Sequence, residues 1–211
     1  VRVPEHLSDA EAATLPCAAL TAWSALFEQG SVGPGDTVLV QGTGGVSVFA
    51  LQLASLAGAR VIVTSSSDAK LERARALGAW QTVNYRSAPD WGKAARRLTG
   101  GEGVDHVVEV GGAETLEQSL KAVKVGGTVS VIGVLSGVSA SFSVIPVLMQ
   151  QVRLQGILVG SREGFEALNR AIAAHELRPV IDRVLPFGET VEAFRTMERA
   201  EHFGKLCIAV R

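Results

Sequence analysis

The chain has 211 residues, of which 47% are hydrophobic and 19% charged, and its formal net charge is −1. This size and composition allow a buried core, and the balanced charge argues against a nucleic-acid partner. Cys17 and Cys207 are the only cysteines and no apolar run has the length of a membrane span, so we expect a cytoplasmic protein without disulfides or membrane contact.

The first 30 residues are predicted to be helical. Ser8 to Glu11 has the sequence of a capping box, which opens a short helix. Pro16 suits the first turn of a second helix, which runs to about Gln29 and ends at Gly30. A turn rich in glycine and proline follows at residues 32–36.

From residue 37 onward, short apolar runs alternate with helical stretches. Strands are predicted at residues 37–41, 60–64, 82–85, 104–110, 128–133 and 152–159, and helices at 46–57, 68–77, 91–98 and 115–123. The strands are almost continuously apolar, as expected when helices cover both faces of a sheet. This pattern predicts an α/β fold with a doubly wound parallel sheet, the Rossmann fold, whose strand order reverses between the first and fourth strands.

The pattern changes after Gly160. A helix is predicted at residues 164–175, an extended segment at 180–186, a helix at 191–199 and a last strand at 205–210. These closing elements need not all belong to the main sheet.

The first strand-to-helix junction contains a glycine turn, Gly42, Thr43, Gly44, Gly45 and Val46, which fits G-x-G-x-x-G with Ser47 in the third glycine position. Gly42 allows the tight turn, and Gly44 and Gly45 let the backbone approach a pyrophosphate at the positive end of the following helix. Because the motif follows a strand and opens a helix, its context favours dinucleotide binding over a simple chain reversal.

The end of the second strand predicts which dinucleotide binds. An NAD site usually places Asp or Glu about 20 residues after the glycines, whereas here Ser65 and Ser66 are followed by Asp68, interpreted as a helix cap. Hydroxyl groups and Lys70 suit a 2′-phosphate, and Tyr85 adds another hydroxyl donor. The sequence therefore favours NADP as cofactor, with NAD less favoured.

Seven stretches of the chain resemble the medium-chain dehydrogenase/reductase superfamily, which includes zinc-type alcohol dehydrogenase-like and quinone oxidoreductase-like proteins. They are LPCAALTAW (15–23), GDTVLVQGTGGVS (35–47), TSSSDAKLERARALGAW (64–80), VNYR (83–86), GVDHVVEVGG (103–112), VIGVLSG (131–137) and HFGKLCIAV (202–210). The resemblance implies three parts: a helical bridge at 1–30, a Rossmann dinucleotide-binding domain at 31–178 and a C-terminal segment at 179–211. That last segment partly returns to a β-rich catalytic domain, most of which would precede residue 1.

The resemblance also assigns roles to individual residues. Thr21 would lie near the nicotinamide, residues 42–46 would hold the pyrophosphate, and Ser65, Ser66, Lys70 and Tyr85 would hold the 2′-phosphate. Val110, Gly133, Val134, Val159, Gly160 and Ser161 would line the nicotinamide, and Lys205 would approach the cofactor. The resemblance implies hydride transfer between NADPH and a carbonyl, quinone or enone substrate, and a homodimer that pairs the edge strand at 152–159. Catalytic residues would lie in the absent domain.

Two other functions stay open from the sequence. Cys17 precedes Thr21 by four residues, as a catalytic zinc ligand does in zinc-dependent alcohol dehydrogenases that use NAD, although packing within an apolar helix is the favoured reading. No metal site is expected within this chain by itself. A non-enzymatic dinucleotide-binding module is the other alternative. His106 is expected to be structural, and Glu109 either to face the cofactor cleft or to be a surface carboxylate.

Overall fold

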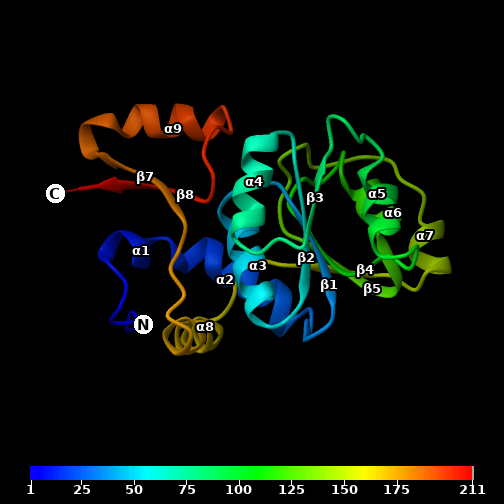
Figure 1. Ribbon diagram of the computed structural model, residues 1–211, viewed down its shortest axis with the longest axis horizontal. Coiled ribbons are helices and arrows are strands. Elements are labelled where there is room, and N and C mark those ends of the chain that lie inside the picture. The colour runs from blue at the N-terminus through cyan, green and yellow to red at the C-terminus, as the bar shows by residue number, and fades with distance from the viewer. Residues whose placement is uncertain (211) are drawn as a thin grey trace.

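A six-stranded parallel sheet forms the centre of the computed structural model, which describes residues 1–210 (Figure 1). Its strands are β1 (Thr37–Gln41), β2 (Arg60–Ser65), β3 (Gln81–Asn84), β4 (Val104–Glu109), β5 (Val123–Val131) and β6 (Arg153–Gly156). They lie in the order β3-β2-β1-β4-β5-β6. The order reverses between β1 and β4, so the predicted doubly wound fold is confirmed.

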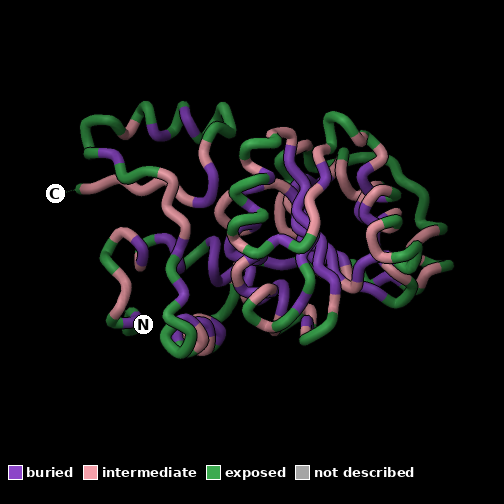
Figure 2. Tube along the Cα trace, in the orientation of Figure 1, coloured by how far each residue is buried: buried purple, intermediate pink, exposed green. Residues whose placement is uncertain are grey.

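Helices cover both faces of this sheet and produce two apolar cores. They are α3 (Gly45–Leu56), α4 (Asp68–Ala76), α5 (Trp91–Leu98), α6 (Leu116–Ala122), α7 (Ile145–Met149) and α8 (Arg162–Ala174). Val38 and Val40 of β1 pack in the cluster that contains Phe49 of α3, whereas Leu39 packs in the cluster that contains Trp91 of α5. Alternate residues of one strand therefore face opposite layers, and the central strand β1 is buried along its whole length (Figure 2).

The N-terminal residues are helical as predicted. The capping box between Ser8 and Glu11 opens α1 (Asp9–Ala13). Helical backbone then runs through η1 (Leu15–Ala19), α2 (Leu20–Trp23) and η2 (Ser24–Glu28). Gly30 follows η2 and is closely surrounded, since a Cβ atom on it would lie 2.2 Å from the Ala25 carbonyl oxygen. The tight packing at this helix end therefore requires glycine.

Two strands in the second half of the sheet have bounds that differ from the prediction, and one helix there was not predicted. β5 begins at Val123 rather than residue 128 and passes through Gly126 and Gly127, because a register shift in the β4–β5 ladder accommodates them. β6 is shorter than predicted and forms the sheet edge. Helix α7 was missed because it is short, none of its five residues is buried and they have no apolar periodicity.

The last part of the chain forms a second, smaller unit. Strands β7 (Ile181–Pro186) and β8 (Lys205–Ala209) pair in parallel, and η3 (Phe187–Glu189) and α9 (Thr190–Glu198) connect them. The backbone of Gly204 bridges to Gly44, so this unit abuts the glycine turn that follows β1. No helix within residues 1–210 is long and apolar enough to cross a membrane.

Candidate cofactor-binding site

A cleft of about 970 Å³ lies at the carboxyl ends of β1, β2, β4 and β5, where a Rossmann sheet binds its ligand. Most of the predicted cofactor-binding residues line it: Gly42, Thr43, Gly44, Gly45, Val46, Ser65, Ser66, Lys70, Tyr85, Val110 and Gly133. The fold thus brings the glycine turn and the serine-rich end of β2 to one cavity.

The glycine turn has the geometry that a pyrophosphate requires. Gly42 has a φ of +70° and its amide donates to the Thr64 carbonyl at 2.8 Å. Within residues 1–210, no side chain caps the first turn of α3. Ser47 donates to the Gln41 carbonyl at 2.6 Å, which holds the helix close to the strand. The residues present therefore fit an anion at the N-terminus of α3.

The end of β2 presents hydroxyl groups to the cleft and directs its nearest acid elsewhere. Ser65 is buried and Ser66 half-buried, and both line the cleft with Tyr85. Asp68 lies outside the lining, and its carboxylate accepts from the Asn84 amide at 2.7 Å. The helix cap is Ser67 rather than Asp68, because the Ser67 hydroxyl accepts from the Lys70 backbone at 3.4 Å.

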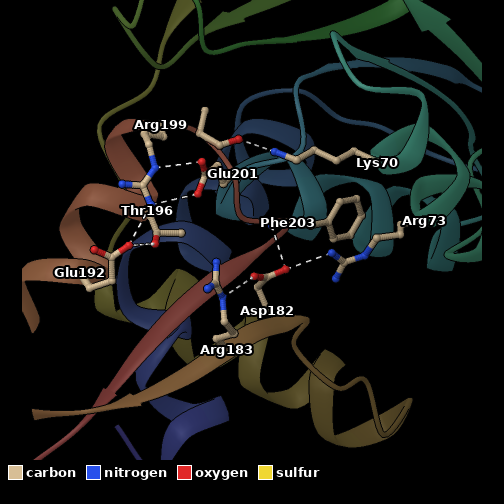
Figure 3. A network of polar contacts seen from close by, with 10 residues as sticks. Lys70, Arg73, Asp182, Arg183, Glu192, Thr196, Arg199, Glu201 and Phe203 are labelled. Atoms are coloured by element: carbon tan, nitrogen blue, oxygen red, sulfur yellow. Dashed lines mark hydrogen bonds and ion pairs between the residues drawn. The ribbon is translucent and has the colours of Figure 1, made fainter. Parts of the chain in front are cut away.

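The opposite wall of the cleft comes from the C-terminal unit. Residues of α9 and the segment before β8 line it, namely Phe194, Met197, Glu198, Ala200 and His202. Lys70 spans the two walls because its ammonium group donates to the Ala200 carbonyl (Figure 3). Burial lowers the pKa of Lys70, and the charge of Asp182 acts in the opposite direction. The resemblance placed Lys205 of this unit near the cofactor, but no motif indicated the residues of α9, since their position depends on how β8 returns to the glycine turn.

Six predicted site residues lie outside the lining of this cleft: Thr21, Val134, Val159, Gly160, Ser161 and Lys205. Thr21 is buried and donates to the Cys17 carbonyl at 2.7 Å, and Ser161 caps α8. A Cβ atom on Gly45 would fall 2.5 Å from Cδ of Lys205, so that side chain lies directly against the glycine turn. Their roles toward the nicotinamide stay predictions.

Glu109 was expected either to face the cleft or to be a surface carboxylate, and it is neither. Its side chain is fully buried beneath the cleft. One carboxylate oxygen accepts from the backbone amides of Gly111 and Gly112 at 2.8 and 3.0 Å. The other accepts from the Gln41 amide at 2.6 Å and from Ser119. Sequence reasoning missed this network because Gln41 and Ser119 are remote along the chain.

Cys17 and His106 have opposite environments. Cys17 was expected to be packed within the helix, but it is exposed. Its side of η1 is turned away from the buried Ala18 and Ala19. Within residues 1–210, no three His, Cys, Asp or Glu side chains are grouped to hold a metal ion. His106 is buried, and burial, followed by the charge of Arg153, lowers its pKa to about 4. It lies outside the cleft, as expected for a structural residue.

The sheet order, the glycine turn at the switch point and the adjoining cleft together define a Rossmann-type NAD(P)-binding domain. The sequence profile described as zinc-binding dehydrogenase matches residues 45–174. The chain belongs to this family, and thereby to the medium-chain dehydrogenase/reductase oxidoreductases.

Individual relatives agree with this assignment. A zinc-type alcohol dehydrogenase-like protein of Schizosaccharomyces pombe is 44% identical over 216 residues, covering 100% of this chain and 62% of that protein. A solved NAD-dependent alcohol dehydrogenase superposes with a TM-score of 0.93 and 41% identity, covering 100% of this chain and 62% of its own. The crotonyl-CoA carboxylase/reductase AntE in complex with NADP superposes with a TM-score of 0.92 and 26% identity, covering 99% of this chain and 58% of its own. The chain thus spans about three fifths of these relatives.

Proposed function

We propose that the chain is the NADP(H)-binding part of an oxidoreductase that transfers hydride between NADPH and a carbonyl, quinone or enone. The observation that carries the choice of NADP is the end of β2, where Ser65, Ser66, Lys70 and Tyr85 line the cleft. A carboxylate at this position would bind the ribose hydroxyls of NAD and repel a 2′-phosphate. Asp68 cannot take that role while its carboxylate binds Asn84.

The residues of the cleft would hold and orient the cofactor. The free amides at the start of α3 would bind the pyrophosphate, and the apolar side of the cleft at Val110 and Ile132 would exclude water beside the nicotinamide. When bound, the nicotinamide supplies or accepts the hydride. The family's solved members include proteins described with NADP and with NAD, so cofactor choice rests on this chain's own residues.

Calorimetric titration with NADPH and with NADH tests this proposal. We expect NADPH to bind at least about tenfold more tightly, because two or more donors meet the extra phosphate. Lys70→Ala should remove most of that preference, whereas Lys93→Ala, at an exposed lysine of α5 that pairs with Asp90, should leave it unchanged. Tighter binding of NADH by the unmodified chain would contradict the NADP assignment and leave the fold intact.

A zinc-dependent alcohol dehydrogenase that uses NAD is the second candidate, and the exposed thiol of Cys17 favours it. A catalytic zinc needs three protein ligands, so the other two would come from outside this chain. Metal analysis of a protein that includes the remaining two fifths of the family's length distinguishes the candidates. Stoichiometric zinc that is lost in Cys17→Ser would support the zinc enzyme. A protein that binds the cofactor but reduces no carbonyl, quinone or enone would support the non-enzymatic module.

We also propose the wider organisation. Residues 1–30 form a helical bridge, 31–178 the dinucleotide-binding domain and 179–211 a segment that joins a catalytic domain. Two copies pair through the β6 edge, where the backbone lacks a neighbouring strand within the described residues. The two cysteines are free in residues 1–210, which fits a reducing cytoplasm.

A further inference from the structure

His202 lies on the short segment between α9 and β8 and lines the cleft across from α4. Its ring is half-buried, and the atom Nδ1 is buried without a hydrogen-bond partner in residues 1–210. A buried ring nitrogen without a partner is unfavourable, so its presence at a ligand cleft indicates a partner that arrives with the ligand.

The charged groups around His202 make this end of the cleft attractive to an anion. Lys70 of α4 and Lys205 of β8 both act on the imidazole as nearby positive charges, and Asp182 of β7 acts as a negative one. Asp182 is already engaged, since it accepts from Arg73 at 3.0 Å, from Arg183 and from the Phe203 backbone (Figure 3).

The two other acids drawn in this network are engaged as well. Glu201, next to His202 in sequence, pairs with Arg199 at 2.9 Å, and Glu192 of α9 pairs with the same arginine at 2.8 Å (Figure 3). Glu198 also lines the cleft, at the end of α9. By contrast, Lys70 contacts the uncharged carbonyl of Ala200, whose φ of +52° is unusual for a residue other than glycine. A phosphate could therefore replace the Ala200 carbonyl as the acceptor of the Lys70 ammonium group, and only one hydrogen bond to a neutral group would be lost.

We propose that His202 recognises the adenosine 2′-phosphate of NADP(H) from the C-terminal wall, opposite Ser65 and Ser66 and beside Lys70. This inference rests on the proposed NADP(H) function and adds a residue from the β7–α9–β8 unit to a site otherwise built by the Rossmann sheet. The C-terminal unit thereby contributes to the choice between NADP and NAD, and not only to closure of the cleft.

Proton uptake distinguishes this role from simple packing. Burial, followed by the charge of Lys70, lowers the pKa of His202, while Asp182 and the Thr196 carbonyl raise it and Lys205 lowers it. The imidazole is therefore neutral in the free chain at pH 7.5. A 2′-phosphate is mostly dianionic at that pH and raises the pKa of a histidine that it contacts. NADPH should bind with uptake of a proton, and its affinity should rise as the pH falls from 7.5 toward 6.5.

Calorimetric titration of the 211-residue chain at pH 7.5, in MOPS and in Tris, measures this uptake from the difference in observed heat. We expect the binding of NADPH to be accompanied by uptake of a fraction of a proton and the binding of NADH by none. His202→Asn keeps a donor near the Nδ1 position but cannot titrate. It should abolish the proton uptake and weaken the binding of NADPH up to about tenfold, while the affinity for NADH changes little. His175→Asn, at an exposed histidine that ends α8, should behave as the unmodified chain.

The outcomes separate the inference from the function on which it rests. Equal uptake with NADPH and NADH, or uptake that persists in His202→Asn, overturns the role of His202. NADPH preference without any uptake overturns the inference but retains the proposed function. Preference for NADH overturns the function itself. Because the first comparison uses the unmodified chain, it holds even where the His202→Asn chain is unstable.

Discussion

The carboxylate of Glu109 shows how a single buried residue can shape the cleft without touching it. It connects Gln41, which precedes the glycine turn, with the amides of Gly111 and Gly112, which follow β4. Both strand ends flank the point where the sheet order reverses. Its acceptors satisfy donors that would otherwise be buried without partners.

Replacing Glu109 should therefore destabilise the fold strongly. Glu109→Ala leaves several buried donors unpaired, and we expect a loss of about 3 kcal/mol or more in the free energy of unfolding. Glu109→Gln should cost less, about 1–3 kcal/mol, because one amide group must face another donor. Urea unfolding measures both. The control is Glu117→Gln on α6, whose exposed pair with Lys121 should contribute less than about 0.5 kcal/mol. Equal effects at Glu109 and Glu117 would contradict the network.

His106 leads to a prediction about pH. Its pKa is lowered from 6.5 to about 4 by burial and by Arg153, with Asp105 acting in the opposite direction. The unfolded chain thus takes up a proton near pH 6.5 and the folded chain only near pH 4, so stability falls as pH decreases between these values. The loss is roughly 3 kcal/mol for this residue.

His106→Leu should remove that part of the slope and stabilise the chain at low pH, since both ring nitrogens lack partners within residues 1–210. Urea unfolding at pH 4.5 and pH 7 measures how the unfolding free energy changes with pH in the unmodified chain and in His106→Leu. The contribution of the carboxylates is common to both chains and cancels in the comparison. His175→Leu, at an exposed histidine, should retain the full slope. An identical slope in His106→Leu would contradict the assignment.

At the scale of elements, the junction between β1 and α3 combines a backbone requirement with a binding requirement. Gly42 has a φ of +70°, and a Cβ atom there would meet nothing within 4 Å, so it would point into open space at the cleft. Gly100, beyond α5, has the same φ and the same open surroundings but lies outside the cleft.

Alanine at these two glycines should therefore have equal effects on stability and different effects on binding. Each substitution should cost about 1–2 kcal/mol in unfolding free energy, because L-residues disfavour this conformation. Gly42→Ala should also weaken NADPH and NADH about equally and by more than about tenfold, since the methyl group obstructs the pyrophosphate. Comparable affinity in the two variants, measured by calorimetry, would exclude a pyrophosphate at this turn.

The same junction explains why much of the fold could be predicted from sequence. The apolar run of β1, the glycines and the helical run of α3 are adjacent, so local preferences and the tertiary fold agree. The cap at Ser8 and the alternation of strands and helices are local in the same way. His202 was not singled out as a site residue, and the buried network of Glu109 was not predicted, because their partners come from other elements. Helix α7 was missed because its exposed apolar residues carry no pattern of burial.

At the scale of the whole molecule, exposed apolar residues gather beside the open sheet edge. Ile145, Leu148 and Met149 of α7 are exposed, with Leu148 and Met149 at 70% and 71%. Leu154 of β6, at the unpaired edge, is partly exposed as well. Helix α7 lies at the opposite end of the molecule from α9 (Figure 1). An apolar surface next to an unpaired strand favours association, and pairing of two copies would cover both features.

We therefore expect sedimentation equilibrium to show a dimer at micromolar concentrations. Leu148→Glu with Met149→Glu should shift it to a monomer, because two charges per copy would be buried at the contact. The control is Val191→Glu with Phe187→Glu in the C-terminal unit, where exposed apolar residues lie remote from α7. If that control dissociates the dimer and the α7 variant does not, the association surface is the C-terminal unit. A dimer that withstands the α7 variant but separates when β6 is blocked by Leu154→Pro would confine the contact to the strand edge, since proline removes a backbone donor needed for pairing.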